Sequence, residues 1–238
     1  MDLNSGQFWS SPITYMVFLP VAGALVMMLV PRTNEVAQKS LALITSLLTA
    51  GVGIVILTQF NYNEANKIQG YVNTSWIDFI NARWIVGIDG ISLPMIALTL
   101  LIVPLCIIYS WNHIPAPGNA KAFLILILIL ETGMLGSFIA LDLILFFVFF
   151  EVMLLPMYFM IGVWGGPNRQ YASIKFFLFT LFGSALMLVS FLALYFLQGT
   201  FQIPELAEMA GSGLARTTGL LIFGGMFLGF GIKVPMFP

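Results

Sequence analysis

Two ionisable residues lie inside long apolar stretches and are the first candidates for chemistry. Glu151 is embedded in LILFFVFFEVMLLPMYFMIGVWG, and Lys233 lies far along GLLIFGGMFLGFGIKVPMFP. An ionisable side chain at the centre of a bilayer costs about 2.5–3.5 kcal/mol on insertion scales, so such residues are kept mainly as partners or as stations for a moving ion. We therefore expect the function to lie at Glu151 and Lys233.

A second carboxylate, Glu131, lies about halfway along another apolar stretch. A turn at Asp142 joins that stretch to the one holding Glu151, so a tight antiparallel hairpin would place both glutamates at similar depth. Two neighbouring carboxylates in a low dielectric cannot both ionise cheaply, and one that keeps its proton near neutral pH suits a proton carrier. If Lys233 faces one of these carboxylates, the pair is expected to act as a charge switch. The alternative is a static ion pair that holds two helices together.

Prolines mark positions where these helices are expected to open. Pro156 follows Glu151 by five residues and leaves the carbonyl of Val152 without its helical donor, and Pro235 does the same to Gly231. Broken helices beside charged residues recur in ion transporters. A plain kink is the alternative at each proline.

Composition sets the class of protein. Of the 238 residues, 60% are hydrophobic and 8% are charged, whereas about a quarter of a soluble domain is charged, so a polytopic membrane protein in a lipid bilayer is predicted. The net charge of -1 argues against nucleic acid as a partner. With one cysteine and one histidine, no zinc or iron–sulfur cluster is expected, and we predict no cofactor and no metal on this chain.

The expected fold is all-α, with about seven transmembrane helices separated by polar, glycine or proline residues. Lysine and arginine residues in the loops divide five against three, which favours an N-terminus outside and a C-terminus inside. The long segment 61–90 carries aromatic residues typical of the membrane interface, and a short strand pair is possible there. The expected spans are 13–30, 41–60, 91–109, 122–141, 143–163, 172–197 and 217–238.

Several segments resemble a known family. ALDLILFFVFFEVMLLPMYFMIGVWGG, YASIKFFLFTLFGSALML, GFGIKVPMFP and the loop GIDGISLP are similar to chain M (subunit 4) of proton-translocating NADH–quinone oxidoreductase, respiratory complex I. The resemblance covers nearly the whole chain, and EVMLLPMY and GIKVPMFP are its specific segments.

The resemblance implies an antiporter-like, non-redox subunit of a translocating enzyme, in which Glu151 and Lys233 form the proton-path pair and Lys233 lies at a broken helix. Glu131, Asp142 and Lys175 fall in family-like segments and are carried over only as accessory candidates. Taken without the family, Asp142 is more typical of a solvated turn and Lys175 of an anchor at the membrane surface. NADH, FMN, iron–sulfur clusters and quinone would belong to partner subunits, and other membrane-arm subunits would be neighbours.

The family is built from about fourteen spans in two inverted repeats, and this chain corresponds to the first half. We therefore expect a fragment or a split product, with residues 1–121 holding the first three helices and the loop 61–90. Residues 122–238 would form the first part of the proton-translocating repeat. The expected location is the plasma membrane of a bacterium, with an organelle membrane as the alternative.

Three other classes remain open. A subunit of a multisubunit cation/proton antiporter or of a membrane-bound hydrogenase would have a similar fold. A seven-helix retinal protein would also carry a lysine in its seventh helix, but it would want a counter-ion deep in the third span, where only Asp89 lies at the edge. A purely structural membrane scaffold is disfavoured by the buried charges.

Overall fold

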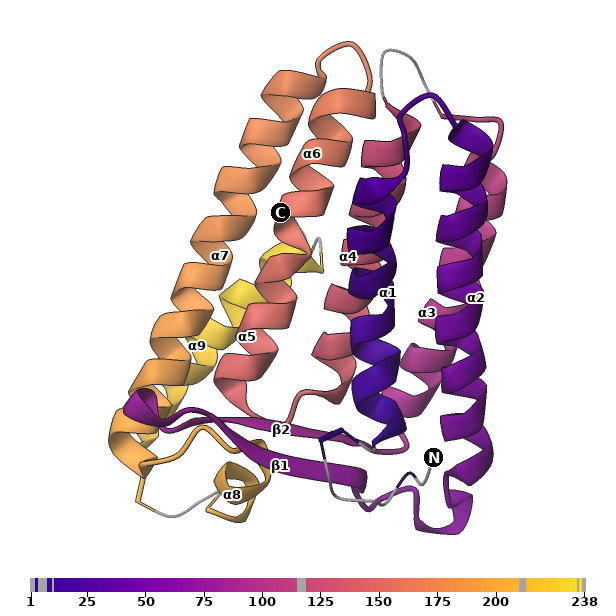
Figure 1. The fold of residues 1–238 in the computed structure, drawn as a ribbon. Coiled ribbons are helices and arrows are strands. Elements are labelled where there is room, and N and C mark those ends of the chain that lie inside the picture. Colours follow the sequence, from indigo (N-terminus) through magenta and orange to yellow (C-terminus); the bar gives the residue numbers. More distant parts are fainter. Residues whose placement is uncertain are drawn as a thin grey trace.

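The computed structural model describes residues 3, 8–9, 11–114, 119–209, 213–234 and 236, and most of these residues are helical (Figure 1). The helices are α1 (Pro12–Leu29), α2 (Glu35–Gln59), α3 (Ser92–Ser110), α4 (Ala120–Ile139), α5 (Leu143–Val152), α6 (Leu154–Trp164), α7 (Arg169–Gln198), α8 (Ile203–Glu208) and α9 (Arg216–Lys233); the strands are β1 (Gln69–Ile77) and β2 (Ala82–Ile88).

Six segments of the described residues are long and apolar enough to cross a membrane, namely α1, α2, α3, α4, the pair α5–α6, and α7. They correspond to the first six expected spans. The seventh expected span contains α9, which has Arg216 at one end and Lys233 at the other. The chain is thus a polytopic helical membrane protein, and the two-stranded hairpin in segment 61–90 is its departure from an all-α fold.

Helices α1 to α4 pack into one bundle (Figure 1). Two apolar clusters lie inside it. The hairpin-side cluster, near the β-strands, includes Val17, Ile56, Leu100 and Leu135. The cluster at the opposite end, here called the Lys121-side cluster, includes Met27, Ala42, Ile107, Leu124 and Leu128. Close helix contact depends on glycines: a Cβ at Gly23 would overlap Thr45, and one at Gly53 would overlap Leu100.

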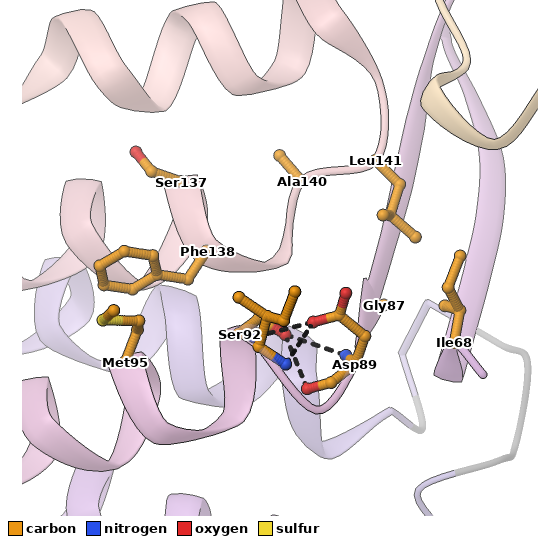
Figure 2. A pocket seen from close by; sticks show the side chains of 10 residues that line it. Ile68, Gly87, Asp89, Ser92, Met95, Ser137, Phe138, Ala140 and Leu141 are labelled. Atoms are coloured by element: carbon orange, nitrogen blue, oxygen red, sulfur yellow. Dashed lines mark hydrogen bonds between the residues drawn. The ribbon is translucent and has the colours of Figure 1, made fainter. Parts of the chain in front are cut away.

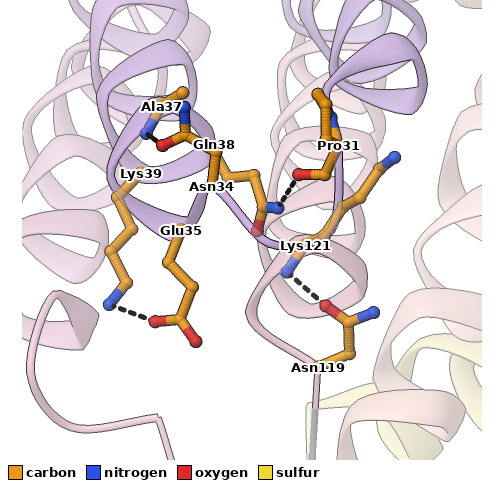
Figure 3. Close-up of polar contacts among 8 residues, drawn as sticks. All are labelled: Pro31, Asn34, Glu35, Ala37, Gln38, Lys39, Asn119 and Lys121. Carbon is orange, nitrogen blue, oxygen red and sulfur yellow. Dashed lines mark hydrogen bonds and ion pairs between the residues drawn. The ribbon is translucent and has the colours of Figure 1, made fainter.

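Backbone-capping side chains fix the Lys121 end of this bundle (Figure 3). Asn34 accepts a hydrogen bond from the N–H of Ala37 and begins α2. The Lys121 Nζ donates to the carbonyls of Met28 and Val30 at 2.8 and 2.7 Å, so a positive charge satisfies the last carbonyls of α1.

The α4–α5 turn is held between two extended segments at the strand end of the molecule. The N–H of Leu141 donates to the Ile85 carbonyl in β2, and its own carbonyl accepts from the N–H of Ile203. Leu143 donates in turn to the Phe201 carbonyl. Three parts of the chain far apart in sequence are thereby joined at the start of α5.

The fifth span is interrupted. α5 ends at Val152 and α6 begins at Leu154, with Met153 between them and Pro156 in the first turn of α6. α9 packs along α7 and runs obliquely to end at about mid-height of the bundle, beside this interruption (Figure 1).

Candidate functional site

Lys233 is the last residue of α9, and its side chain reaches α5 across the bundle. The Nζ donates to the backbone carbonyl of Phe150 at 3.0 Å and lies 4.0 Å from the centre of the Phe150 ring. Phe230, one turn earlier on α9, packs against the same ring. A cation over an aromatic face is attracted by the ring, and more strongly when it is desolvated.

The Phe150 carbonyl is available because α5 ends two residues later. The last four carbonyls of a helix have no intrahelical donor, and the C-terminus carries partial negative charge. The interruption at Met153 therefore creates an acceptor for a cation at membrane depth. Lys233 occupies it, and the residue that follows Phe150 is Glu151.

Glu151 has both carboxylate oxygens buried and without a hydrogen-bond partner. It interacts electrostatically with Lys233, but the two groups do not form a direct ion pair: within the described chain the ion pairs are Lys39–Glu35 and Lys67–Glu64. The predicted partners are thus neighbours, with Lys233 bound to the backbone next to Glu151.

Glu131 is fully buried, and neither of its carboxylate oxygens has a partner. It lies eight residues before Ile139, and Glu151 lies eight after Leu143, so the two occupy corresponding depths of the hairpin. Their directions differ. A Cβ at Gly133 of α4 would meet the Phe149 carbonyl of α5 and Met153 just beyond it. A helix turns about 100° per residue, so Glu131 is rotated about 200° from the α5-facing side.

The same rotation applies to α5. Phe149 and Met153 are the residues that meet the glycines of α4, and Glu151 lies between them on the opposite side of the helix. The two glutamates therefore project away from each other. Equal depth in a hairpin does not imply a shared face, so the sequence indicates the depth of the two glutamates but not the sides of the helices on which they lie.

Asp142 is completely buried and caps α5. Its carboxylate accepts hydrogen bonds from the N–H groups of Ile144, Leu145 and Arg83, at 2.9, 3.1 and 3.3 Å. Burial raises the pKa of Asp142, while these three bonds and the Arg83 charge act in the opposite direction. The prediction that Asp142 lies in a solvated turn is therefore wrong. Its contacts show that it anchors the start of the helix that carries Glu151.

The remaining predicted residues divide into described and undescribed ones. Lys175 is exposed near the start of α7, with its Nζ 5.8 Å from the ring centre of Tyr171. Pro156 is buried in α6, three residues after the interruption. Pro235 lies outside the described residues. The Phe150 carbonyl is the group that sequence reasoning missed, because a backbone acceptor leaves no mark on residue type. Pro156 predicted an opening of this helix, but at the carbonyl of Val152.

A recess of about 370 Å³ lies where β2 meets α3 (Figure 2). Asp89 Oδ1 accepts from the N–H groups of Ile91 and Ser92 at 3.1 and 2.8 Å, and the Ser92 Oγ accepts from the N–H of Asp89. Burial raises the pKa of Asp89, but the bonds from Ser92 and Ile91 outweigh it and leave the pKa lowered. These reciprocal bonds start α3, and the recess is separate from Lys233.

Comparisons with known proteins agree with this architecture. Residues 15–137 match the family described as NADH-ubiquinone oxidoreductase chain 4, amino terminus. Residues 140–238 match NADH:quinone oxidoreductase/Mrp antiporter, TM.

Among curated relatives, NADH-ubiquinone oxidoreductase chain 4 of Prototheca wickerhamii is 37% identical over 99% of this chain and 47% of its own length. NADH-quinone oxidoreductase subunit M of Rhodobacter capsulatus is 37% identical over 95% of this chain and 46% of its own. The chain thus spans about half the length of these relatives.

Solved structures show the same fold. A chain of respiratory complex I from Thermus thermophilus with bound NADH superposes with a TM-score of 0.81 and 28% identity, over 95% of this chain and 44% of that one. A chain of the Mrp complex from Dietzia sp. gives 0.78 at 15% identity, over 93% and 23%, and shows the fold alone. The chain belongs to the NADH-quinone oxidoreductase chain 4 (subunit M) family.

Proposed function

We propose that this chain conducts protons as a non-redox membrane subunit of NADH-quinone oxidoreductase. The observation that carries the proposal is Lys233, which binds the Phe150 carbonyl at the interrupted α5–α6 span, next to Glu151. A cation, a carboxylate and an open helix end at one depth supply what a charge switch needs. Because the chain spans about half of its relatives, the complete proton path would include further residues.

The switch follows from electrostatics. Ionised Glu151 favours the charged form of Lys233, and a proton arriving on Glu151 removes that attraction. Two unit charges 4 Å apart at an effective dielectric constant of about 20 interact by about 4 kcal/mol, and the longer separation here gives less. A change of about 1.4 kcal/mol shifts a protonation equilibrium tenfold. Proton transfer at one group therefore biases the other.

Electron transfer belongs to other chains in this proposal. Partner subunits would bind NADH, FMN, iron–sulfur clusters and quinone, and other membrane-arm subunits would pack against this one. The proposed location is the plasma membrane of a bacterium. An organelle membrane is the alternative, because relatives of equal identity come from Rhodobacter capsulatus and Prototheca wickerhamii.

The test is Glu151→Gln in membrane vesicles that contain the assembled complex. We expect proton pumping coupled to NADH oxidation to fall by at least tenfold while the subunit still assembles, because the amide cannot carry the proton. Glu151→Asp should retain more pumping. The matched control is Glu208→Gln, on the exposed end of α8. Wild-type pumping in Glu151→Gln would overturn the proposal.

A cation/proton antiporter subunit is the second candidate, favoured by the family description that includes Mrp antiporters for residues 140–238. The two functions differ in what drives transport. Proton movement that requires NADH supports the first, and proton movement driven by a cation gradient without NADH supports the second.

A further inference from the structure

Glu131 lies on a side of α4 that the Glu151–Lys233 site does not use. Thr132 donates to the Val17 carbonyl and so faces α1, while Gly133 faces α5. Glu131 continues that rotation by a further step of about 100°, to the side where α2 and α3 pack against α4. Its surroundings are therefore set by α2 and α3.

α2, which packs against α4, carries buried hydroxyl groups along this part of the bundle. Ser46 of α2 is fully buried, and its Oγ has no hydrogen-bond partner. Thr49, one turn further, is also fully buried and donates to the Thr45 carbonyl, which leaves its oxygen free to accept. Buried polar groups are normally paired with protein or with ordered water. An unpaired hydroxyl and an unpaired carboxyl on neighbouring helices thus provide hydrogen-bonding groups for a small polar ligand.

Two prolines add backbone acceptors at the same level. α1 and α2 run antiparallel; Pro20 precedes Gly23 by three residues, and Thr49 follows Thr45, the contact of Gly23, by four. Pro20 therefore lies level with Thr49. It cannot donate to the carbonyl of Met16, which is left open.

The same reasoning applies to α3. Leu100 contacts Gly53 of α2; Pro104 follows Leu100 by four residues, and Thr49 precedes Gly53 by four. Pro104 is buried and cannot donate to the Leu100 carbonyl. No charge lies near Pro104 along the chain, but the fold brings it level with Thr49 and Pro20. Pro20 is one turn from Val17, whose carbonyl accepts from Thr132, the residue next to Glu131.

Apolar packing closes this layer on both sides. The hairpin-side cluster supplies Ile56, Leu100 and Leu135 on one side, and the Lys121-side cluster supplies Ala42 and Leu128 on the other. An uncompensated carboxylate in such an interior costs far more than a neutral acid. Glu131 has no ion-pair partner among the described residues, so its neutral, protonated form fits the site.

We propose that Glu131 is the centre of a second buried site, which binds water and holds an exchangeable proton. Glu131 provides the acidic proton; Ser46, Thr49 and the open carbonyls of Met16 and Leu100 provide the other hydrogen bonds to water. The site is distinct from Glu151 and Lys233, and it exists whether or not this chain conducts protons.

Infrared difference spectroscopy on membranes with the assembled complex tests this directly. We expect a carbonyl-stretch band of a protonated carboxylic acid at neutral pH that is lost in Glu131→Gln and shifts in heavy water. If Glu131→Gln fails to assemble, isotope-labelled glutamate and Glu131→Asp identify the same band by its shift. Absence of the band means an ionised carboxylate and overturns the proposal.

Ser46→Ala tests the hydrogen-bonded part of the site. The acid band should move to higher frequency, because one partner of the bound water is removed. Ser184→Ala is the matched control: Ser184 is fully buried in α7, but its hydroxyl is already bonded to the Leu181 carbonyl. If neither Ser46→Ala nor heavy water changes the frequency of the acid band, the carboxyl group does not contact water, and the proposed water site is overturned.

Discussion

The two arms of the α4–α5 hairpin carry the same residue at the same depth in opposite settings. α4 is a continuous helix of 20 residues, and half of the residues in its span are buried. Glu131 on it forms no ion pair within the part of the chain that the structure describes. The α5–α6 arm is divided at Met153, is 28% buried, and carries Glu151 beside Lys233. The intact helix encloses a buried carboxyl without a hydrogen-bond partner, whereas the interrupted one supplies the acceptor that holds a cation next to a carboxyl.

Removal of the Lys233 cation tests the difference between the two arms most directly. Lys233→Met keeps a long side chain but has no donor for the Phe150 carbonyl, so we expect NADH-driven proton pumping to fall at least tenfold with the subunit still assembled. Lys67→Met is the matched control, because Lys67 is an exposed loop lysine whose Nζ pairs with Glu64 at 2.7 Å, away from α5 and α9; its pumping should stay within about twofold of wild type. Equal losses in both variants would contradict the special role of Lys233.

Sequence reasoning found the helices and the charged residues because both depend on local information. Glu151 and Lys233 are visible as charges in apolar runs, and Pro156 marks the interrupted span. The burial of Asp142 was misjudged, and the direction of Glu131 was not predicted. Both depend on which face of α4 meets α5 and on how β2 and residues 201–203 enclose the turn, and these contacts between distant segments are not encoded in any local pattern.

Separating the two arms should have the next largest effect. A Cβ at Gly136 would overlap the ring of Phe149, so Gly136→Ala forces α5 away from α4 and should destabilise the protein by about 1–3 kcal/mol, as overpacking does. Gly51→Ala is the matched control: nothing lies within 4 Å of its added Cβ, and alanine favours a helix, so stability should hold or rise. The measurement is the midpoint of thermal unfolding in detergent, and equal midpoints for the two variants would rule out close packing of the arms.

The start of α5 offers a smaller and more local test. Asp142→Ala leaves the N–H groups of Ile144, Leu145 and Arg83 without their acceptor and should cost about 1–2 kcal/mol. Asp142→Asn keeps one acceptor oxygen and should cost less. Because the folded-state pKa of Asp142 is raised, wild-type stability should rise as pH falls through that pKa, and Asp142→Asn should lack this slope. A steeper slope in the Asn variant would contradict the assignment.

The smallest expected effect lies at Asp89, which is outside the α4–α5 hairpin. Its folded-state pKa is lowered by the bonds from Ser92 and Ile91, so the stability it contributes is present above the unfolded value of 3.8 and is lost as pH falls through the folded value. Asp89→Asn keeps an acceptor but removes the charge, and it should cost about 0.5 kcal/mol at neutral pH.

Thermal unfolding of both proteins at decreasing pH measures this contribution. The difference between wild type and Asp89→Asn should be constant at neutral pH and shrink only on the acid side of 3.8, because protonation makes Asp89 neutral like its substitute. Proton pumping should be unchanged, since the Asp89 recess is separate from Lys233 and Glu151. If the stability difference grew as the pH fell, the pKa of Asp89 would be raised rather than lowered by folding. A loss of proton pumping would connect the recess to the α5–α6 interruption.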